Sequence, residues 1–277
     1  SVVDVFDTNK YAHDPRNDFL NWSLIELGTF DYAADAWGYT YGIAGEWYQD
    51  RWTARIGGFA LSRVPNSKAL DTSGSQFQLV SELEERHTIF GQPGKLKALF
   101  FLSRGRIGAY DDATALALAT GAPADLAPVR YYRSKMGGGF NLEQQVTEDI
   151  GLFARAGITQ GDLEAYDFTD IQRTVSLGAS IAGRGWGRPD DTVGLGGAIN
   201  MASRNARNYF NAGGLGILVG DGQLPNAGPE QIVEAFYSAA VTKFAKITAD
   251  YQFVNHPAYN RDRGPVSIFA ARVHAQF

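Results

Sequence analysis

Charged side chains recur at every second position along many stretches of this 277-residue sequence. In FQLVSELEER (77–86), for example, Leu79 and Leu83 alternate with Glu82 and Glu84. Carboxylates and guanidinium groups form strong, charge-assisted hydrogen bonds, and hydroxyl groups are among their partners. Parity along these stretches assigns the following charged residues to one polar surface: Glu46, Arg55, Glu82, Glu84, Lys97, Arg104, Glu143, Arg155, Glu234, Asp250 and Arg272. The set mixes both signs, which argues against strong selection between anions and cations, because such selection usually needs rings of one sign.

Residues with catalytic potential are few. The four histidines are His13, His87, His256 and His274, and none lies in a GxSxG or HExxH setting. The glycine-rich stretch 213–222 lacks the Lys-Ser/Thr pair of a phosphate-binding loop. We therefore predict no catalytic residue and no enzyme activity.

An acidic stretch near the start raises the question of a metal site. It contains Asp4, Asp7, His13, Asp14 and Asp18. We favour an interpretation as turns, because Asp and Asn stabilise turns and proline, here at position 15, fixes their backbone. We predict no metal and no cofactor, although loop oxygens can bind calcium.

Extended strands are the elements that would place these side chains on one face. Period-two alternation recurs in 39–48, 52–58, 77–86, 94–103, 140–146, 151–159, 173–183, 191–200 and 245–253. With 1–8, 19–30, 232–243 and the last strand, the pattern predicts about twelve strands. Short turns (49–51, 148–149) alternate with long loops near 62–75, 107–135, 160–172, 202–230 and 255–265, and 111–121 is expected to form a helix within its loop.

The composition is typical of a folded chain, with 44% apolar and 20% charged residues and a mean hydropathy of -0.22. No stretch approaches the roughly 20 apolar residues that a spanning helix needs. A net charge of -5 provides no general basic field, so we expect no nucleic-acid partner. There is no cysteine, which excludes a disulfide scaffold.

The same alternation fits a soluble β-sandwich and a membrane β-barrel, and parity alone does not give the direction of the apolar face. Aromatic residues such as Trp47, Trp52 and Tyr251 lie near strand ends, as in the interfacial girdles of membrane barrels. The polar face is rich in Gly, Thr, Ser and Gln, which suits a wet lining. Phe277 ends an apolar set with Val273 and Phe269, and we expect it to rest at a lipid interface. These features favour the membrane barrel.

Several long motifs strengthen that interpretation. They are DVFDTNKYAHDPRNDFLNWSL (4–24), FDYAADAWGYTYGIAGEWY (30–48), NAGGLGILVGDGQLPNAGPEQIVEAFYS (211–238) and TADYQFVNHPAYNRDRGPVSIFAARVHAQF (248–277). The sequence resembles the carbohydrate-selective porin family, the OprB-like porins of Gram-negative outer membranes. This resemblance implies an all-β, antiparallel transmembrane barrel of about sixteen strands, through whose narrow water-filled pore small sugars diffuse. It also implies that the outer-membrane assembly machinery reads Phe277.

The expected organisation is one barrel domain over residues 1–277, without the family's N-terminal strands and signal peptide. The expected partners are small sugars, the lipid bilayer and lipopolysaccharide, and an oligomer is possible. Three alternatives stay open at this point: a general-diffusion porin, a soluble carbohydrate-binding β-domain, and a barrel enzyme such as an outer-membrane lipase.

Overall fold

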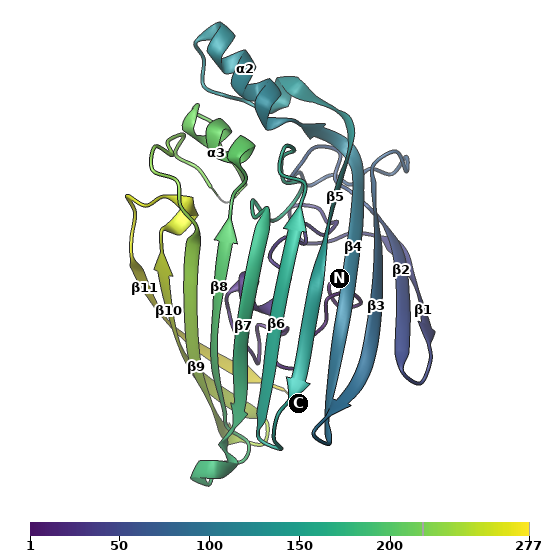
Figure 1. The fold of residues 1–277 in the computed structure, drawn as a ribbon, viewed down its shortest axis with the longest axis vertical. Helices are drawn as coiled ribbons and strands as arrows, with labels where there is room; N and C mark the ends of the chain where they lie inside the picture. Colours follow the sequence, from purple (N-terminus) through teal and green to yellow (C-terminus); the bar gives the residue numbers. More distant parts are fainter. Residues whose placement is uncertain (218, 277) are drawn as a thin grey trace.

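The computed structural model describes residues 1–217 and 219–276, and Phe277 lies outside the described residues. Within this part of the chain, eleven antiparallel strands form one sheet in strict chain order (Figure 1). The strands are β1 (Gly42–Tyr48), β2 (Trp52–Ala60), β3 (Phe77–Ile89), β4 (Gln92–Gly108), β5 (Arg130–Gln145), β6 (Ile150–Thr159), β7 (Arg173–Ala182), β8 (Thr192–Met201), β9 (Glu230–Thr242), β10 (Ala245–Asn255) and β11 (Val266–Ala275). The helices are α1 (Trp22–Ile25), α2 (Tyr110–Thr120), α3 (Arg204–Asn211) and the short 3-10 turns η1 (Ala127–Val129), η2 (Gly183–Trp186) and η3 (Pro257–Tyr259). The predicted all-β antiparallel fold is confirmed.

The first 38 residues, which we call the inner segment, contain no strand. The prediction of strands at 1–8 and 19–30 was wrong, and the other eleven predicted segments are strands, where about twelve strands were expected. The reason is that the backbone of this segment bonds to charged side chains instead of to a neighbouring strand. The amide of Asp7 donates to Glu82 at 2.7 Å, and the amide of Asn21 donates to Glu234 at 2.9 Å.

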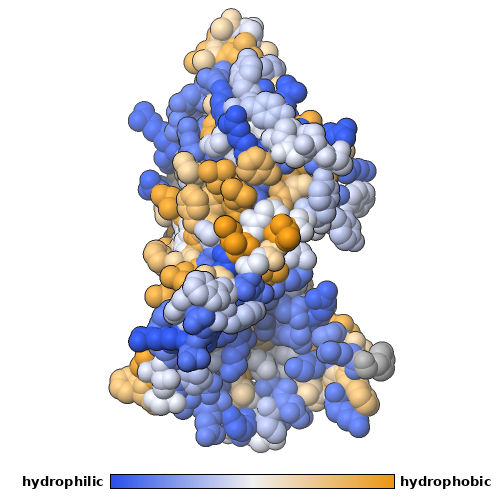
Figure 2. Space-filling view, turned by 90° about the vertical axis from the view of Figure 1, so that its right-hand side faces the viewer, coloured by the Kyte–Doolittle hydropathy of each residue, from blue (hydrophilic) through white to orange (hydrophobic). Residues whose placement is uncertain are grey.

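The polarity of the two faces of the sheet is the reverse of that in a soluble sheet. On the outer face, large apolar side chains are exposed, among them Leu177 at 62% and Phe140 at 59%. On the inner face, charged side chains are buried, among them Glu234 at 0% and Arg155 at 1%. Figure 2, which looks at the side of β1, shows hydrophobic residues gathered at mid-height and hydrophilic residues dominating the lower end. The structure therefore shows that the apolar face points outward, which parity alone left open.

Short and long connections segregate to opposite ends of the sheet (Figure 1). At one end the connections are 49–51, 90–91, 146–149, 183–191 and 243–244. At the other end they are 61–76, 109–129, 160–172, 202–229 and 256–265. The helix predicted at 111–121 is confirmed as α2, which ends at Gly121 with a left-handed φ of 72°. The long loops and their helices therefore all project from one end.

Apolar residues bury themselves between the inner segment and the sheet. Phe6, Leu27 and Phe30 pack against Val80 and Phe101 of the inner face. Phe19 packs edge-on against two further rings of that face, those of Phe153 (5.3 Å) and Phe236 (5.0 Å). Among the described residues, no pairing joins β1 to β11, and no helix is long and apolar enough to cross a membrane.

Candidate functional site: an aromatic and polar cavity on the inner face

One buried guanidinium fastens the middle of the inner segment to the sheet. Arg155, from β6, lies fully buried and contacts Asp7 Oδ1 through its Nε at 3.2 Å. The same group donates to the carbonyl oxygens of Leu24 (2.7 Å), Ala12 (2.8 Å) and Ile25 (3.1 Å). Burial of a charge is costly unless it is paired and hydrogen-bonded, and here Arg155 has both kinds of partner. Arg155 thus connects three separate turns of the inner segment.

Asp7 is the counterpart of Arg155 within the segment. Its carboxylate also accepts hydrogen bonds from Asn141 Nδ2 at 2.6 Å and from the amide of Leu27 at 2.5 Å. Its backbone has a left-handed φ of 60°, a conformation that Asp tolerates better than most residues. The Asp7 carboxylate therefore joins two parts of the segment to β5 and β6.

A second attachment lies on β9 and β11. The carboxylate of Glu234 accepts hydrogen bonds from the amides of Leu20 and Asn21, at 2.5 and 2.9 Å. The guanidinium of Arg272 donates to the carbonyl oxygens of Pro15 and Asp18, the latter at 3.0 Å. The sheet thus presents a carboxylate to backbone amides and a guanidinium to backbone carbonyls, as their opposite polarities require.

Further along the inner face, charges pair mainly with one another. Arg55 forms ion pairs with Glu46 (2.8 Å), Glu82 (2.8 Å) and Glu84 (3.1 Å). Lys97 lies 3.8 Å from Glu84 and donates to the hydroxyl of Thr8 at 2.8 Å. Each charge of this cluster has a partner of opposite sign, and Lys97 attaches the beginning of the inner segment through Thr8.

The loop end of the inner face contains a cavity of about 660 Å³. Its wall is formed by the inner segment, the 160–172 loop, and the strands β9 and β10. Its lining residues include Asn21, Trp22, Glu26, Phe30, Tyr32, Trp37, Phe168, Glu230, Gln252 and Tyr259. The carboxylate of Asp31 fixes the loop wall, because it accepts hydrogen bonds from the amides of Asp167 (3.0 Å) and Phe168 (2.9 Å).

Both aromatic and polar residues line this cavity. Trp22 and Trp37 are 58% and 65% exposed, so both retain large free surfaces. Tyr32 and Phe168 have ring centroids 4.6 Å apart. Asn21 donates to Gln252 at 3.1 Å, which places an amide pair between the segment and β10. Aromatic faces pack on the apolar faces of a sugar ring, and amides and carboxyls bond its hydroxyls.

Glu26 adds a carboxyl group with an unusual proton affinity. Burial, together with the negative charge of Asp7, raises the pKa of Glu26 well above its usual range. Within the described residues its side chain forms no hydrogen bond, although only 7% of the residue is exposed. A protonated carboxyl both donates and accepts a hydrogen bond, which matches the capacity of a hydroxyl.

The structure brings most of the predicted polar surface together. Ten of its members lie on the inner face: Glu46, Arg55, Glu82, Glu84, Lys97, Glu143, Arg155, Glu234, Asp250 and Arg272. The assignment of Arg104 was wrong. Arg104 is paired with Phe77 and shares the parity of Phe100 and Leu102, so it lies on the outer face, near the ring of Tyr132. Even positions on β4 point outward, so the alternation of the strand itself places Arg104 outside, and the charge of Arg104 was misleading.

Sequence reasoning missed the cavity residues Asn21, Trp22, Glu26, Trp37, Glu230 and Gln252. Most of them belong to the inner segment, where no alternation marks a face. The available signal was the occurrence of NWSL (21–24) and AWGY (36–39), each a tryptophan beside turn-forming residues.

The acidic stretch 4–18 supports the turn interpretation. The carboxylate of Asp18 accepts hydrogen bonds from the amides of His13 and Asp14, both at 3.0 Å. Asp14 in turn accepts from the amide of Arg16 at 3.0 Å. Among the residues that the structure describes, no group of three or more His, Asp or Glu is arranged to hold a metal ion.

Comparisons with known proteins agree on the architecture. The family model described as "Carbohydrate-selective porin, OprB family" matches residues 2–277. No curated protein matches the chain. A solved structure of Pseudomonas putida OprB is 17% identical with a TM-score of 0.69, and the match covers 86% of this chain and 59% of that one. Pseudomonas aeruginosa OccK11 is 11% identical with a TM-score of 0.50, and the match covers 84% and 57% of the two chains. The chain thus spans about three fifths of the length of these structures, and the likeness establishes a shared fold.

Proposed function

The chain belongs to the OprB family of carbohydrate-selective porins, and we propose that it forms the wall and lining of a pore in the outer membrane of a Gram-negative bacterium. Small sugars diffuse passively through this pore, and no chemical step takes place. The single observation that carries the proposal is the cavity of Trp22, Trp37, Glu26 and Gln252, which lies on the polar side of a sheet whose opposite side is apolar.

The reversed sheet supports the membrane part of the proposal. An apolar outer face avoids the cost of exposing polar groups to lipid, while a polar inner face borders water. In a soluble β-domain, the exposed Leu177 and Phe140 would face water, and the buried Glu234 and Arg155 would lie in the core. That arrangement opposes the hydrophobic effect on both faces.

The cavity supports the saccharide preference. A pyranose has apolar faces and a hydroxyl rim, and the tryptophan rings offer surfaces for the faces while Glu26, Gln252 and Asn21 offer groups for the rim. Exposed rings bind weakly, as a conducting site requires. Most of the ten charged residues of the inner face already bind the inner segment or one another, so we assign them the role of holding the segment in place.

A liposome-swelling assay tests this proposal. Vesicles that contain the purified protein are diluted into neutral sugars of graded size and into charged solutes of matched size. We expect faster entry of the small sugars than of equal-sized charged solutes. Replacement of both Trp22 and Trp37 by Ala should reduce this preference several-fold, since each stacked ring is worth about 1 kcal/mol.

Trp47→Ala is the matched control, because Trp47 is 63% exposed and lies on the outer side of β1. It should leave the preference unchanged. Entry ranked by size alone in the wild-type protein would instead identify a general-diffusion pore. Absence of swelling by folded, inserted protein would contradict the pore itself.

A further inference from the structure

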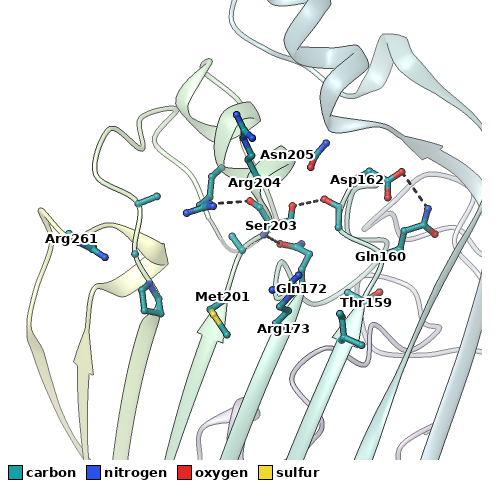
Figure 3. A pocket seen from close by; sticks show the side chains of 17 residues that line it. Thr159, Gln160, Asp162, Gln172, Arg173, Met201, Ser203, Arg204, Asn205 and Arg261 are labelled. Carbon is teal, nitrogen blue, oxygen red and sulfur yellow. Dashed lines mark hydrogen bonds between the residues drawn. The ribbon is translucent and has the colours of Figure 1, made fainter.

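A second cavity lies at the loop end, where β6, β7 and β8 end beneath α3, and it has a volume of about 710 Å³. Four arginines line it: Arg173, Arg204, Arg207 and Arg261. Figure 3 shows Arg173, Arg204 and Arg261 around one opening, carried by β7, α3 and the loop between β10 and β11. Arg173 shares the outward parity of Val175 and Leu177, so this cavity opens on the outer side of the sheet.

The positive charge of this cavity is not neutralised. Within the described part of the chain, none of the four guanidinium groups has a carboxylate within 4 Å. Asp162 is the one carboxylate in the described lining, and it accepts a hydrogen bond from Gln160 at 3.4 Å. Most other arginines of the chain form ion pairs. These four have no carboxylate partner, so a bound anion would supply the missing negative charge.

The scaffold beneath the arginines is well fixed. The hydroxyl of Ser203 caps α3 by accepting from the amide of Ala206 at 3.0 Å, and it donates to the carbonyl of Gly161. The amide of Ser203 donates to the side chain of Gln172 at 2.8 Å (Figure 3). Gly228 leaves room for Arg261, since a Cβ atom there would lie 2.5 Å from its Nε. The arginines therefore project from anchored backbone.

An apolar groove of about 840 Å³ adjoins this cavity on the strand side. The two share five lining residues, namely Ile158, Thr159, Gln160, Arg173 and Met201. The groove continues down the outer face between Phe100, Met136, Phe140 and Val175, whose side chains are all more than 40% exposed. A basic cavity thus continues directly into an apolar groove that follows the strands.

We propose that the two cavities together bind one phosphorylated lipid, the lipid A portion of lipopolysaccharide. Its phosphates lie on the four arginines and its acyl chains follow the groove. The inference rests on the proposed membrane location, because the long loops of such barrels face outward and the cavity lies at the loop end. Arginine binds phosphate bidentately, and the groove buries the chains that a free phosphate lacks.

The test is a binding measurement on detergent-purified protein, which does not depend on permeation. A fluorescent bisphosphorylated lipid A is titrated, and its dephosphorylated form and its deacylated disaccharide bisphosphate are compared with it. We expect the intact lipid to bind at least about tenfold more tightly than either, because each comparison removes one half of the complementarity.

The combined variant Arg173→Gln, Arg204→Gln, Arg261→Gln should lose the preference for the phosphorylated lipid. Arg204→Gln alone should reduce this preference measurably. Because Arg204 is exposed on α3, this single variant is expected to fold normally even if the combined variant does not. Arg106→Gln is the matched control, since Arg106 is exposed on the same rim, forms no ion pair among the described residues, and lies outside the cavity.

Three outcomes would overturn the inference: equal binding of the phosphorylated and dephosphorylated lipids, an unchanged preference in the folded combined variant, or displacement of the lipid by millimolar inorganic phosphate. The last would indicate a phosphate site. Sugar entry into liposomes that lack lipopolysaccharide should be the same for this variant and the wild-type protein, so a failure of the lipid site and a failure of the pore are distinguishable.

Discussion

At the scale of single residues, the position of the inner segment depends on buried charges that are paired with its backbone and side chains. Arg155 is the clearest case, because one side chain satisfies Asp7 and three backbone carbonyls of the inner segment. A buried ion pair contributes modestly when intact, but its loss is expensive, since the partner stays behind without a counterion. The position of the inner segment thus depends on a few such attachments.

Arg155→Met keeps much of the side-chain length and removes the charge. We expect the free energy of unfolding to fall by about 3–5 kcal/mol, because Asp7 and the carbonyls lose their donor. Unfolding in urea measures this, and proteolysis within residues 1–38 should accelerate.

Arg184→Met is the control for that substitution. Arg184 is half-exposed at the short-turn end, where it pairs with Asp149 and Glu148. Exposed pairs contribute little, because solvent screens them, so little change in the free energy of unfolding is expected. Equal losses in the two variants would show that Arg155 has no special role.

Glu26 should make stability depend on pH. Its folded pKa lies above the unfolded value of 4.5, so the stability that its protonated form contributes is fully present below about pH 4.5. That contribution is lost as the pH rises through the folded pKa. Glu26→Gln cannot ionise, so the variant should match the wild-type protein at pH 4 and exceed it in stability at pH 8.

Thermal or urea unfolding at both pH values checks this expectation. The matched control is Glu148→Gln, at a largely exposed position of a short turn. A difference between Glu26→Gln and wild type that stays constant from pH 4 to pH 8 would rule out the ionisation of Glu26 as its cause.

At the scale of elements, glycines of the sheet let the inner segment approach the backbone closely. A Cβ atom at Gly157 of β6 would lie 2.3 Å from Thr29 Oγ1 and 2.8 Å from Leu27 Cδ1. A Cβ atom at Gly151 of the same strand would lie 2.0 Å from the ring of Tyr11. The segment and the strand therefore fit each other only while these positions lack side chains.

Gly157→Ala should displace the segment near Thr29 and lower the free energy of unfolding by about 1–3 kcal/mol, the usual cost of overpacking. Gly45→Ala on β1 is the control, because a Cβ atom there meets nothing within 4 Å. Urea unfolding of both variants decides the matter, and an equal or larger effect at Gly45 would contradict the close-packing argument.

The elements also show what a sequence can predict. Alternation predicts strands such as β3 and β10, because the two faces of a sheet with different surroundings require polar and apolar side chains at alternate positions. The conformation of the inner segment was not predicted, because its amides bond to Glu82 and Glu234, which lie 75 and 213 residues away. The cavity near Trp22 exists only once that segment is in place, so the alternation of the strands does not predict it. Arg104 shows the remaining weakness, since charge alone does not identify the inner face.

At the scale of the whole molecule, the arrangement of polarity is reversed from that of a soluble protein. Apolar side chains cover the outside of the sheet and charges fill its inside, and the long loops gather at one end. A medium of low polarity around the outer face, with water along the inner face, satisfies both faces at once.

Leu177→Arg tests that environment directly. Leu177 lies in the middle of β7 and faces outward, so a charge there should lower the free energy of unfolding in lipid vesicles by about 2–4 kcal/mol. Leu118→Arg is the control, because Leu118 is 82% exposed on α2, away from the sheet. If Leu177→Arg folds into vesicles as stably as Leu118→Arg, the outer face does not meet lipid.

The attachment of the inner segment also has a kinetic consequence. Its hydrogen bonds to the sheet join residues from 45 apart (Ala33 and Gln78) to 257 apart (Pro15 and Arg272). Closing such long loops costs entropy before any bond compensates for it, and non-local contacts slow folding. The strands that carry Glu82, Arg155 and Arg272 (β3, β6 and β11) must already belong to one sheet before the segment has all its partners. Docking of residues 1–38 is therefore expected to be a late step in refolding, with tryptophan fluorescence near Trp22 changing after strand pairing is complete.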